Sequence, residues 1–281
     1  MKTNNPMQLK AYIKKKAAEK NISAQLVMQN YMLERLLERI SVSKYQSNLI
    51  LKGGFLISAI VGLDTRATMD LDATIKGFDV THDTVRRIFE EIGSVPIEDD
   101  IKFEVLNTSD IREGDDYPGI RVSLRANYPP LAVPLSVDVT TEDKITPRAI
   151  EYSFKLLFED RTIKIMAYNM ETVLAEKLET VITRGIANTR PRDFYDIYIL
   201  YQLRGHECDK TVLKSALVET ASRRKSISLM SNYKTVLENI AASKQMKGFW
   251  RKYQTDFDYA KDINFTDVCH MIVRIFAEIG F

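Results

Sequence analysis

A glycine pair behind a short apolar run, followed by two aspartates separated by one leucine, constrains this chain more than any other feature. Gly53 and Gly54 directly follow Ile50-Leu51-Lys52. A backbone without Cβ atoms can pass close to a polyphosphate and adopt unusual φ angles. The feature predicts a strand over 49–52, a tight turn, and a helix over 55–61 whose N-terminus favours an anion.

Asp70 and Asp72 have the spacing of residues on one face of a strand, with Leu71 on the opposite face. In an extended strand their side chains lie roughly 6–7 Å apart. Carboxylates this close repel each other, so a site that keeps both ionised usually contains a divalent cation. Oxygen ligands of this kind suit Mg²⁺. A solvated strand face is the alternative, and the neighbouring glycine pair makes a metal–nucleotide site the better interpretation.

Size and composition set broad limits on the class of protein. A chain of 281 residues, 45% of them hydrophobic, can bury the cores of two modest domains. Its formal net charge of +2 requires neither nucleic acid nor a membrane as a partner. Cys208 and Cys269 have no metal-ligand spacing and suit a reducing cytoplasm. No apolar run approaches the length of a membrane span, so no membrane partner is expected.

The pattern of elements predicts an α+β protein in which a region of strands and helices precedes an all-α region. Helices are expected over 6–39, with a cap at Ser23, and over 83–92. Strands are expected over 49–52, 70–75, 101–107, 120–126 and 135–140, with a loop over 110–119. The segment 154–170 is interpreted as a connection, with helices following it. We predict two domains, residues 1–165 and 166–281.

Four stretches occur in the order L-K-G-G-F-L-I-S, R-A-T-M-D-L-D, A-E-K-L-E-T and R-P-R-D-F-Y-D-I-Y. Together they resemble the AbiEii/AbiGii toxin family of nucleotidyltransferases, in the polymerase-β-like superfamily. The resemblance runs from about Leu33 to Leu203. It implies a polymerase-β-like nucleotidyltransferase domain, with a mixed sheet flanked by helices, followed by an all-α C-terminal domain. Phe55 stands where many relatives have Ser or Thr, and Ser58 lies one helical turn further on.

The resemblance implies that Asp70 and Asp72 are catalytic residues and metal ligands. Enzymes of this kind place a third carboxylate on a strand such as 135–140, and Asp138 in this strand is the best match. An ordinary aspartate on a polar strand face is the alternative for Asp138. Glu142 and Asp143, in the turn that follows, are weaker alternatives for the third ligand.

Lys177 and Asp193 are the expected catalytic residues of the helical half. Lys177 lies at the edge of an apolar helical stripe, where a lysine commonly extends toward solvent. The resemblance implies that it contacts the triphosphate. Asp193 complements the dipole of a helix that begins near Pro191. The resemblance implies that Asp193 orients Lys177 or a metal-bound water. The expected nucleotide-binding residues are Lys52, Gly53, Gly54, Ser58, Arg66 and Arg192, the last of which is alternatively a partner of Asp196.

The activity implied by the resemblance is Mg²⁺-dependent transfer of a nucleotide from a nucleoside triphosphate, GTP or a pyrimidine triphosphate such as CTP. The implied acceptor is the 3′ end of tRNA. The implied setting is a cytoplasmic toxin of a toxin–antitoxin or abortive-infection system, with an AbiEi-type antitoxin that acts as a repressor. A nucleotidyltransferase that modifies a protein or a small molecule is one alternative. A non-catalytic nucleotide-binding regulator is another, although it would not need the repulsive pair Asp70 and Asp72.

The basic, aromatic stretch 249–253 also has two interpretations. Aromatic rings beside basic side chains suit base stacking with an RNA end. A buried Trp250 surrounded by solvated charges explains the same pattern and is the better interpretation.

Overall fold

The structure is a computed structural model that describes residues 5–111, 119–141 and 143–281. Most of the loop expected over 110–119, and Glu142, therefore lie outside the described residues. The chain divides into two compact units, residues 1–143 with 149–167 and residues 144–148 with 168–281. None of the helices in the described ranges combines the length and apolar character of a membrane span.

The first unit begins with two capped helices. In α1 (Pro6–Lys20) the Asn5 side chain accepts from the amide of Gln8, and in α2 (Ala24–Val42) Ser23 accepts from that of Leu26. Two further helices are α3 (Gly53–Val61) and α4 (His82–Gly93). The hydrophobic core includes α2, because its side chains are buried over most of its length.

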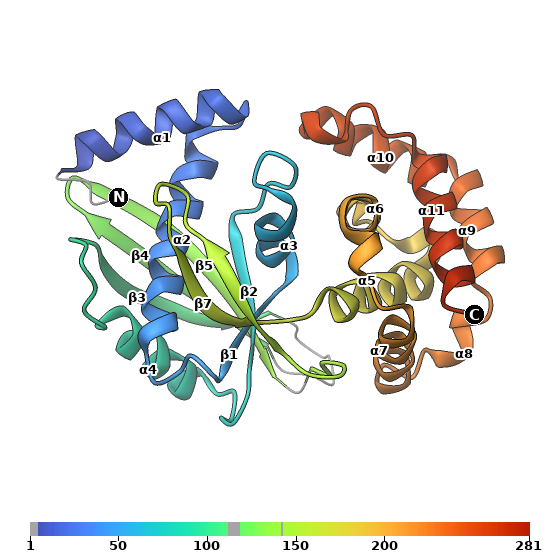
Figure 1. The fold of residues 1–281 in the computed structure, drawn as a ribbon, viewed down its shortest axis with the longest axis horizontal. Helices are drawn as coiled ribbons and strands as arrows, with labels where there is room; N and C mark the ends of the chain where they lie inside the picture. Colours follow the sequence, from blue (N-terminus) through green and yellow to red (C-terminus); the bar gives the residue numbers. More distant parts are fainter. Residues whose placement is uncertain (1–4, 112–118, 142) are drawn as a thin grey trace. The chain divides into compact units, whose positions relative to one another are not determined.

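The sheet of the first unit is mixed, and its described strands follow the order β3-β4-β5-β2-β1-β7-β6. Its strands are β1 (Leu49–Lys52), β2 (Asp70–Ile75), β3 (Lys102–Asp110), β4 (Gly119–Tyr128), β5 (Leu131–Thr141), β6 (Ile150–Lys155) and β7 (Thr162–Ala167). The pairs β2–β5 and β1–β7 are parallel, and the other neighbours are antiparallel. Helices α2 and α4 contact each other and the sheet (Figure 1). The mixed sheet confirms the predicted α+β class.

The interpretation of 154–170 as a simple connection is wrong, because most of it belongs to the hairpin β6–β7. Ile163, Ile165 and Ala167 alternate with half-buried or exposed residues, which is a strand signal. In β6 the alternation is weak, since Phe154 is its only buried residue. β6 lies at the sheet edge, where a strand needs little apolar character because one side has no neighbour. Its place in the sheet depends on pairing with β7.

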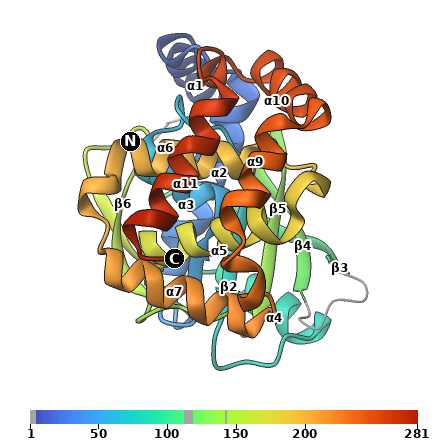
Figure 2. The ribbon, with the colours of Figure 1, turned by 90° about the vertical axis from the view of Figure 1, so that its right-hand side faces the viewer.

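The second unit is helical in its described residues, as predicted. Its helices are α5 (Met170–Arg184), η1 (Gly185–Ala187), α6 (Pro191–Arg204), η2 (Gly205–Glu207), α7 (Lys210–Arg223), α8 (Ile227–Met230), α9 (Tyr233–Ala242), α10 (Lys244–Asp256), η3 (Asp258–Ala260) and α11 (Phe265–Glu278). Helices α9 and α11 lie side by side (Figure 2). Trp250 is only 2% exposed and packs against Tyr253 and Phe265. A buried Trp250 is therefore the correct interpretation of the stretch 249–253.

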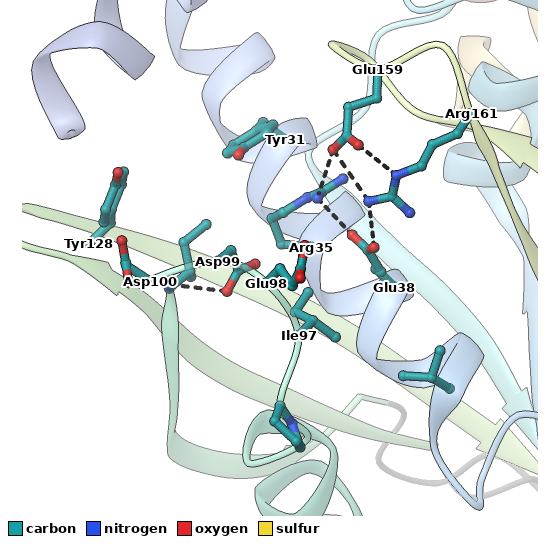
Figure 3. Close-up of a pocket in the computed structure, with 13 residues that line it drawn as sticks. Tyr31, Arg35, Glu38, Ile97, Glu98, Asp99, Asp100, Tyr128, Glu159 and Arg161 are labelled. Carbon is teal, nitrogen blue, oxygen red and sulfur yellow. Dashed lines mark hydrogen bonds and ion pairs between the residues drawn. The ribbon is translucent and has the colours of Figure 1, made fainter. Parts of the chain in front are cut away.

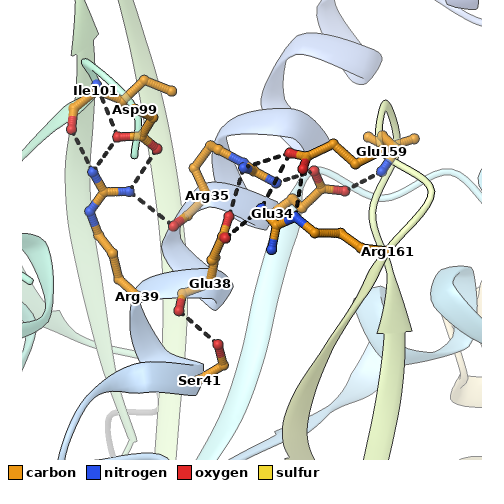
Figure 4. A network of polar contacts seen from close by, with 10 residues as sticks. Glu34, Arg35, Glu38, Arg39, Ser41, Asp99, Ile101, Glu159 and Arg161 are labelled. Carbon is orange, nitrogen blue, oxygen red and sulfur yellow. Dashed lines mark hydrogen bonds and ion pairs between the residues drawn. The ribbon is translucent and has the colours of Figure 1, made fainter. Parts of the chain in front are cut away.

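A network of buried charges joins α2 to the turn between β6 and β7 (Figure 4). Glu34, which is 1% exposed, accepts from Arg35 at 2.7 Å and from the backbone amide of Leu157 at 2.5 Å. Arg35 also pairs with Glu38 at 2.6 Å and with Glu159 at 3.3 Å. Burial raises the pKa of Glu34 to about 7, although the charge of Arg35 opposes the rise.

We expect Glu34 to make the first unit less stable as the pH rises from about 4.5 to about 7. The pKa of Glu34 is raised, so in this window the folded chain keeps a proton that the unfolded chain releases. Glu34→Gln removes this titration, so its free energy of unfolding should fall less than that of the wild type between pH 5 and 8. The expected difference is on the order of 2 kcal/mol, from about 1.4 kcal/mol per pKa unit. Urea unfolding followed by circular dichroism at both pH values measures it.

Glu104→Gln is the matched control, because the Glu104 side chain is 54% exposed in its pair with Arg125. Its pH dependence should follow that of the wild type. Parallel pH profiles for Glu34→Gln and the wild type would contradict the assigned role of Glu34.

Candidate active site

Antiparallel pairing of β1 with β2 brings the glycine pair against Asp72. Lys52 at the end of β1 lies opposite Asp72, and α3 begins at the next residue, Gly53. The amide of Gly54 donates to Oδ2 of Asp72 at 3.3 Å. Gly53 has a φ of +62°, and a Cβ placed there would lie 2.2 Å from the same oxygen. The position therefore requires glycine for both its backbone conformation and its contact with Asp72.

Four charged residues lie in a row across neighbouring strands. Lys52 is opposite Asp72, Asp72 is opposite Asp138, and Asp138 is opposite Arg121. Directly opposite residues project from the same face of a sheet, and adjacent strands lie about 4.8 Å apart. Asp70 shares this face because it precedes Asp72 by two residues. The structure thus brings the three predicted aspartates to one face, between two cations.

Arg121 lies at the β4 end of the row and pairs with Asp138. Its Nε and Nη2 atoms donate to the two carboxylate oxygens of Asp138 at 2.7 and 2.8 Å. The hydrogen bonds to Asp138 raise the pKa of the Arg121 guanidinium, and the charges of Asp70 and Asp72 add to the rise. Arg121 thus stabilises the ionised carboxylates on this face.

Asp143 holds Lys52 at the other end of the row. The Lys52 ammonium donates to Oδ2 of Asp143, and so do the hydroxyls of Thr74 and Thr140. Burial raises the pKa of Asp143, but Lys52 and these hydroxyls outweigh it and hold the pKa well below its usual range. Asp143, the weaker alternative for the third ligand, is therefore ionised and is engaged with Lys52.

The carboxylate oxygens on this face have the chemistry that Mg²⁺ prefers, and the first two aspartates fit such an ion. Asp70 is exposed and Asp72 is half-buried. A few carboxylates leave the rest of an Mg²⁺ shell to water and phosphate oxygens. No group of three potential ligand side chains is arranged around a common point within the described residues. In Asp138 each oxygen accepts one hydrogen bond from Arg121, and the second lone pair of each oxygen is the position that could bind a metal.

Two further predicted nucleotide-binding residues lie near the glycines in sequence but differ in their surroundings. Arg66 is 4% exposed, and a Cβ on Gly54 would lie 3.0 Å from its Nη2 atom. Arg66 therefore packs directly against the glycine pair. Ser58 is buried on α3 and lines a cavity of about 310 Å³ that also contains Lys20 and Asn30.

Lys177 on α5 joins two buried aspartates of α6 in the second unit. Its ammonium lies 2.6 Å from Oδ1 of Asp193 and 3.0 Å from Oδ2 of Asp196. Burial lowers the pKa of Lys177, but Asp196 and Asp193 outweigh it, so the pKa lies above its ordinary value. The predicted pairing of Lys177 with Asp193 is present, and Asp196 is an additional partner.

The second carboxylate oxygen of Asp193 is a free acceptor in this cluster. Asp193 is 4% exposed, and its buried Oδ2 has no hydrogen-bond partner among the described residues. Arg192 is exposed. The cluster thus holds Lys177 between two buried carboxylates and leaves one acceptor position of Asp193 vacant.

A cavity of about 820 Å³ in the first unit contains none of the predicted site residues (Figure 3). Four of its charged side chains are engaged with one another. Arg161 pairs with Glu38 and with Glu159, each at 2.5 Å, and Arg35 also pairs with both acids. These four side chains belong to the α2 network described above.

Sequence reasoning missed Arg121 and the hydroxyls of Thr74 and Thr140. Arg121 is one of several polar residues that alternate along β4, so the local pattern does not distinguish it. Only the register of β4 on β5 places it opposite Asp138. Thr74 follows Asp72 by two residues, which is the one local signal for the shared face.

Gly53→Ala should displace Asp72 and lower the free energy of unfolding by at least about 1–2 kcal/mol, because a left-handed φ is costly for a residue with a Cβ. The 2.2 Å contact with Asp72 adds to this cost. Thermal unfolding measures the loss of stability, and a nucleotidyl-transfer assay measures the effect of displacing Asp72.

Gly248→Ala is the control, because Gly248 lies inside α10 and a Cβ there meets nothing within 4 Å. It should stabilise the protein by about 0.5–1 kcal/mol, the ordinary gain for alanine in a helix. Equal stabilities of Gly53→Ala and wild type would contradict the described glycine contact.

Lys177→Met should destabilise the second unit by about 3–5 kcal/mol, because it leaves Asp193 and Asp196 buried without their cation. The triple variant Lys177→Met/Asp193→Asn/Asp196→Asn should regain much of this stability, since no buried charge remains. Urea unfolding followed by the fluorescence of Trp250, the single tryptophan of the chain, reports on this unit. If the single variant were as stable as the wild type, the ion cluster would have no structural role.

The chain resembles one protein family and several solved structures. The model of the family described as "Nucleotidyl transferase AbiEii toxin, Type IV TA system" matches residues 35–269. A comparison with proteins of curated function gives no match. Among solved structures, JHP933 from Helicobacter pylori is 12% identical with a TM-score of 0.49, covering 92% of each chain. An antigenic nucleotidyltransferase-like protein from Paracoccidioides brasiliensis is 18% identical with a TM-score of 0.42, covering 69% of this chain and 91% of its own.

The family match includes both the aspartates of β2 and the Lys177 cluster. It spans well over half of the chain, and it confirms the resemblance drawn from the four sequence stretches. The chain belongs to the AbiEii nucleotidyl transferase toxin family of type IV toxin–antitoxin systems and is a nucleotidyltransferase.

Proposed function

We propose that this nucleotidyltransferase uses Mg²⁺ to transfer a nucleoside monophosphate from a nucleoside triphosphate to the 3′ end of tRNA, with release of pyrophosphate. The observation that carries the proposal is the contact of Asp72 with the glycine pair, beside Asp70 and Asp138 on the same sheet face. A triphosphate with its metal fits such a combination of carboxylates, amide groups and cations.

Asp70 and Asp72 would hold the Mg²⁺, with Asp138 as a third ligand through a lone pair that Arg121 does not use. Bound Mg²⁺ would lower the pKa of the acceptor hydroxyl and neutralise charge on the α-phosphate and the leaving pyrophosphate. The Gly54 amide keeps the Asp72 carboxylate in place through its hydrogen bond of 3.3 Å. In the absence of substrate, Arg121 compensates the charge of Asp138.

The phosphates of the donor would lie at the glycine pair and the start of α3. The first amides of a helix have no partner within the helix and attract anions. Arg66 and Lys52 contribute positive charge, Arg66 from beside Gly54 and Lys52 from the end of β1. Ser58 and Arg192 are further candidates for phosphate contacts.

Lys177 is proposed to contact the triphosphate, and Asp193 to orient it. A lysine held at 2.6 Å by one buried carboxylate has a defined position, which a catalytic cation requires. The free Oδ2 of Asp193 is an acceptor that a water molecule can occupy. The chemistry depends on positioning and charge neutralisation, since an in-line displacement at phosphorus needs little covalent participation by the protein.

The remaining parts of the proposal come from the family. The donor is GTP or a pyrimidine triphosphate. The protein acts as a cytoplasmic toxin that arrests growth, and its AbiEi-type antitoxin acts as a repressor. A protein hydroxyl or a small molecule is the competing acceptor. The basic side chains of the helical unit favour RNA, because a small acceptor would not need them.

Incubation with each α-³²P-labelled nucleoside triphosphate, Mg²⁺ and total tRNA tests the proposal. We expect label on tRNA for the wild type and a loss of about 100-fold or more for Asp72→Asn, since metal-bound charge stabilisation contributes several kcal/mol to the barrier. Chelation of Mg²⁺ should have the same effect. Sequencing of the labelled RNA 3′ ends identifies the donor and the site.

Asp160→Asn is the matched control, because the Asp160 side chain is fully exposed and lies outside the site. It should label tRNA as the wild type does. Label on protein in place of tRNA would favour the competing acceptor. A wild type that transfers no label to any acceptor, although it binds triphosphate, would favour the non-catalytic regulator.

A further inference from the structure

A basic pocket of about 620 Å³ lies in the second unit, between α10 and the turn that leads into α11. We call it the α10–α11 pocket, and it is defined by the residues Lys244, Lys247, Trp250, Arg251, Gln254, Lys261, Asp262, Ile263, Asn264, Phe265 and Thr266. None of the residues assigned above to nucleotidyl transfer belongs to it.

Two side chains of α10, Trp250 and Gln254, hold the turn 260–263, which forms the other wall of this pocket. The indole of Trp250 donates to the carbonyl of Ile263 at 2.9 Å. The amide of Gln254 donates to the carbonyls of Ala260 at 3.2 Å, Lys261 at 2.8 Å and Ile263 at 3.0 Å. The turn 260–263 is therefore attached to α10 at several points, and Lys261 projects from a fixed backbone.

The charges of the pocket are strongly unbalanced. Its lining has four basic side chains, all exposed, and one acidic side chain, Asp262. Among the described residues, none of the four forms an ion pair. Two cations assigned to nucleotidyl transfer or its site differ in this respect, since Arg121 and Lys177 are each held by a carboxylate. Four like charges around one pocket repel one another, so an anion that enters the pocket relieves that repulsion.

We propose that the α10–α11 pocket binds the phosphodiester backbone of the nucleic acid that accepts the nucleotide. The inference rests on the proposed function in taking the acceptor to be a nucleic acid. Lysine supplies compact charges for phosphate, and Arg251 supplies a planar group that can donate two hydrogen bonds to one phosphate. Trp250 is 2% exposed, so contact with phosphates, and not base stacking on this ring, is the mode of binding.

The composition of the pocket favours a nucleic acid over an acidic protein. Interfaces between proteins are depleted in lysine, whereas interfaces with nucleic acids are polar and strongly positive. The lining contains three lysines and one arginine, and Trp250 and Phe265, its aromatic residues, are both buried. The aromatic rings of the lining are therefore closed to a protein partner, whereas its four basic side chains are exposed.

Lys247→Gln/Arg251→Gln tests the proposal by removing two charges one helical turn apart on α10. Fluorescence anisotropy with a fluorescein-labelled single-stranded RNA, without nucleotide or Mg²⁺, measures the dissociation constant at several salt concentrations. We expect the dissociation constant to rise about tenfold at physiological salt. The slope of log K against log salt should fall in magnitude by about 1.4, from about 0.7 per phosphate contact on single strands.

The matched control is Lys10→Gln/Lys14→Gln, which removes the same charge at the same spacing from the exposed side of α1. The control should bind RNA as the wild type does. A charge-conserving variant, Lys247→Arg/Arg251→Lys, should retain the salt slope. Circular dichroism melting confirms that each variant folds.

A single-stranded DNA of the same sequence and a polyglutamate peptide complete the test. Equal losses for RNA and DNA support a backbone phosphate contact, and a loss larger for RNA adds a contact to ribose. The proposal is overturned if the α10 variant keeps the RNA affinity and salt slope of the wild type, or if only polyglutamate binding is weakened. A protein that binds RNA here but transfers no nucleotide would contradict the proposed function and leave the phosphate contact of the pocket intact.

Discussion

The contact between the Asp72 carboxylate and the backbone of Gly53 is the constraint on which the first unit depends. An added Cβ at Gly53 would lie 2.2 Å from the carboxylate oxygen, so the two strands can adopt this register only with glycine. The register sets Lys52 opposite Asp72 and starts α3 directly beside it. A carboxylate pair next to a helix N-terminus is electrostatically favourable when a cation and a phosphate lie between them.

In both units, acidic side chains that lie close together are paired with basic side chains. On the sheet, Arg121 pairs with Asp138 and Lys52 pairs with Asp143. On the helices, Lys177 pairs with Asp193 and Asp196. Like charges this close to one another repel, and the paired cations reduce that repulsion. The pairs also hold the carboxylates in position before a metal or a triphosphate arrives.

The distribution of charge is more informative than its total. The net charge of +2 does not reveal how the charges are arranged. The active site and the network on α2 contain ion pairs, whereas the α10–α11 pocket is basic. Paired cations position acidic groups, whereas cations without partners remain available for a ligand. The same residue types therefore serve two purposes, and their partners in space distinguish them.

Local patterns in the sequence determined much of this protein. The glycine pair, the alternation around Asp70 and Asp72, and the helical period of α5 each depend on neighbours in the chain, which periodicity describes directly. The strand 70–75 was predicted with the bounds that the structure shows. The order of the four stretches was sufficient to indicate the family that the comparison confirms.

The tertiary structure decided what depends on register and on distant pairing. Strand β6 has little alternation of its own and joins the sheet through β7. Arg121 reaches Asp138 only because β4 pairs with β5 in one register, and a shift by one residue would move it to the other face. Asp196 meets Lys177 only because α5 packs against α6. These contacts join residues far apart in the chain, so no local pattern carries the information, and folding alone brings the charges together.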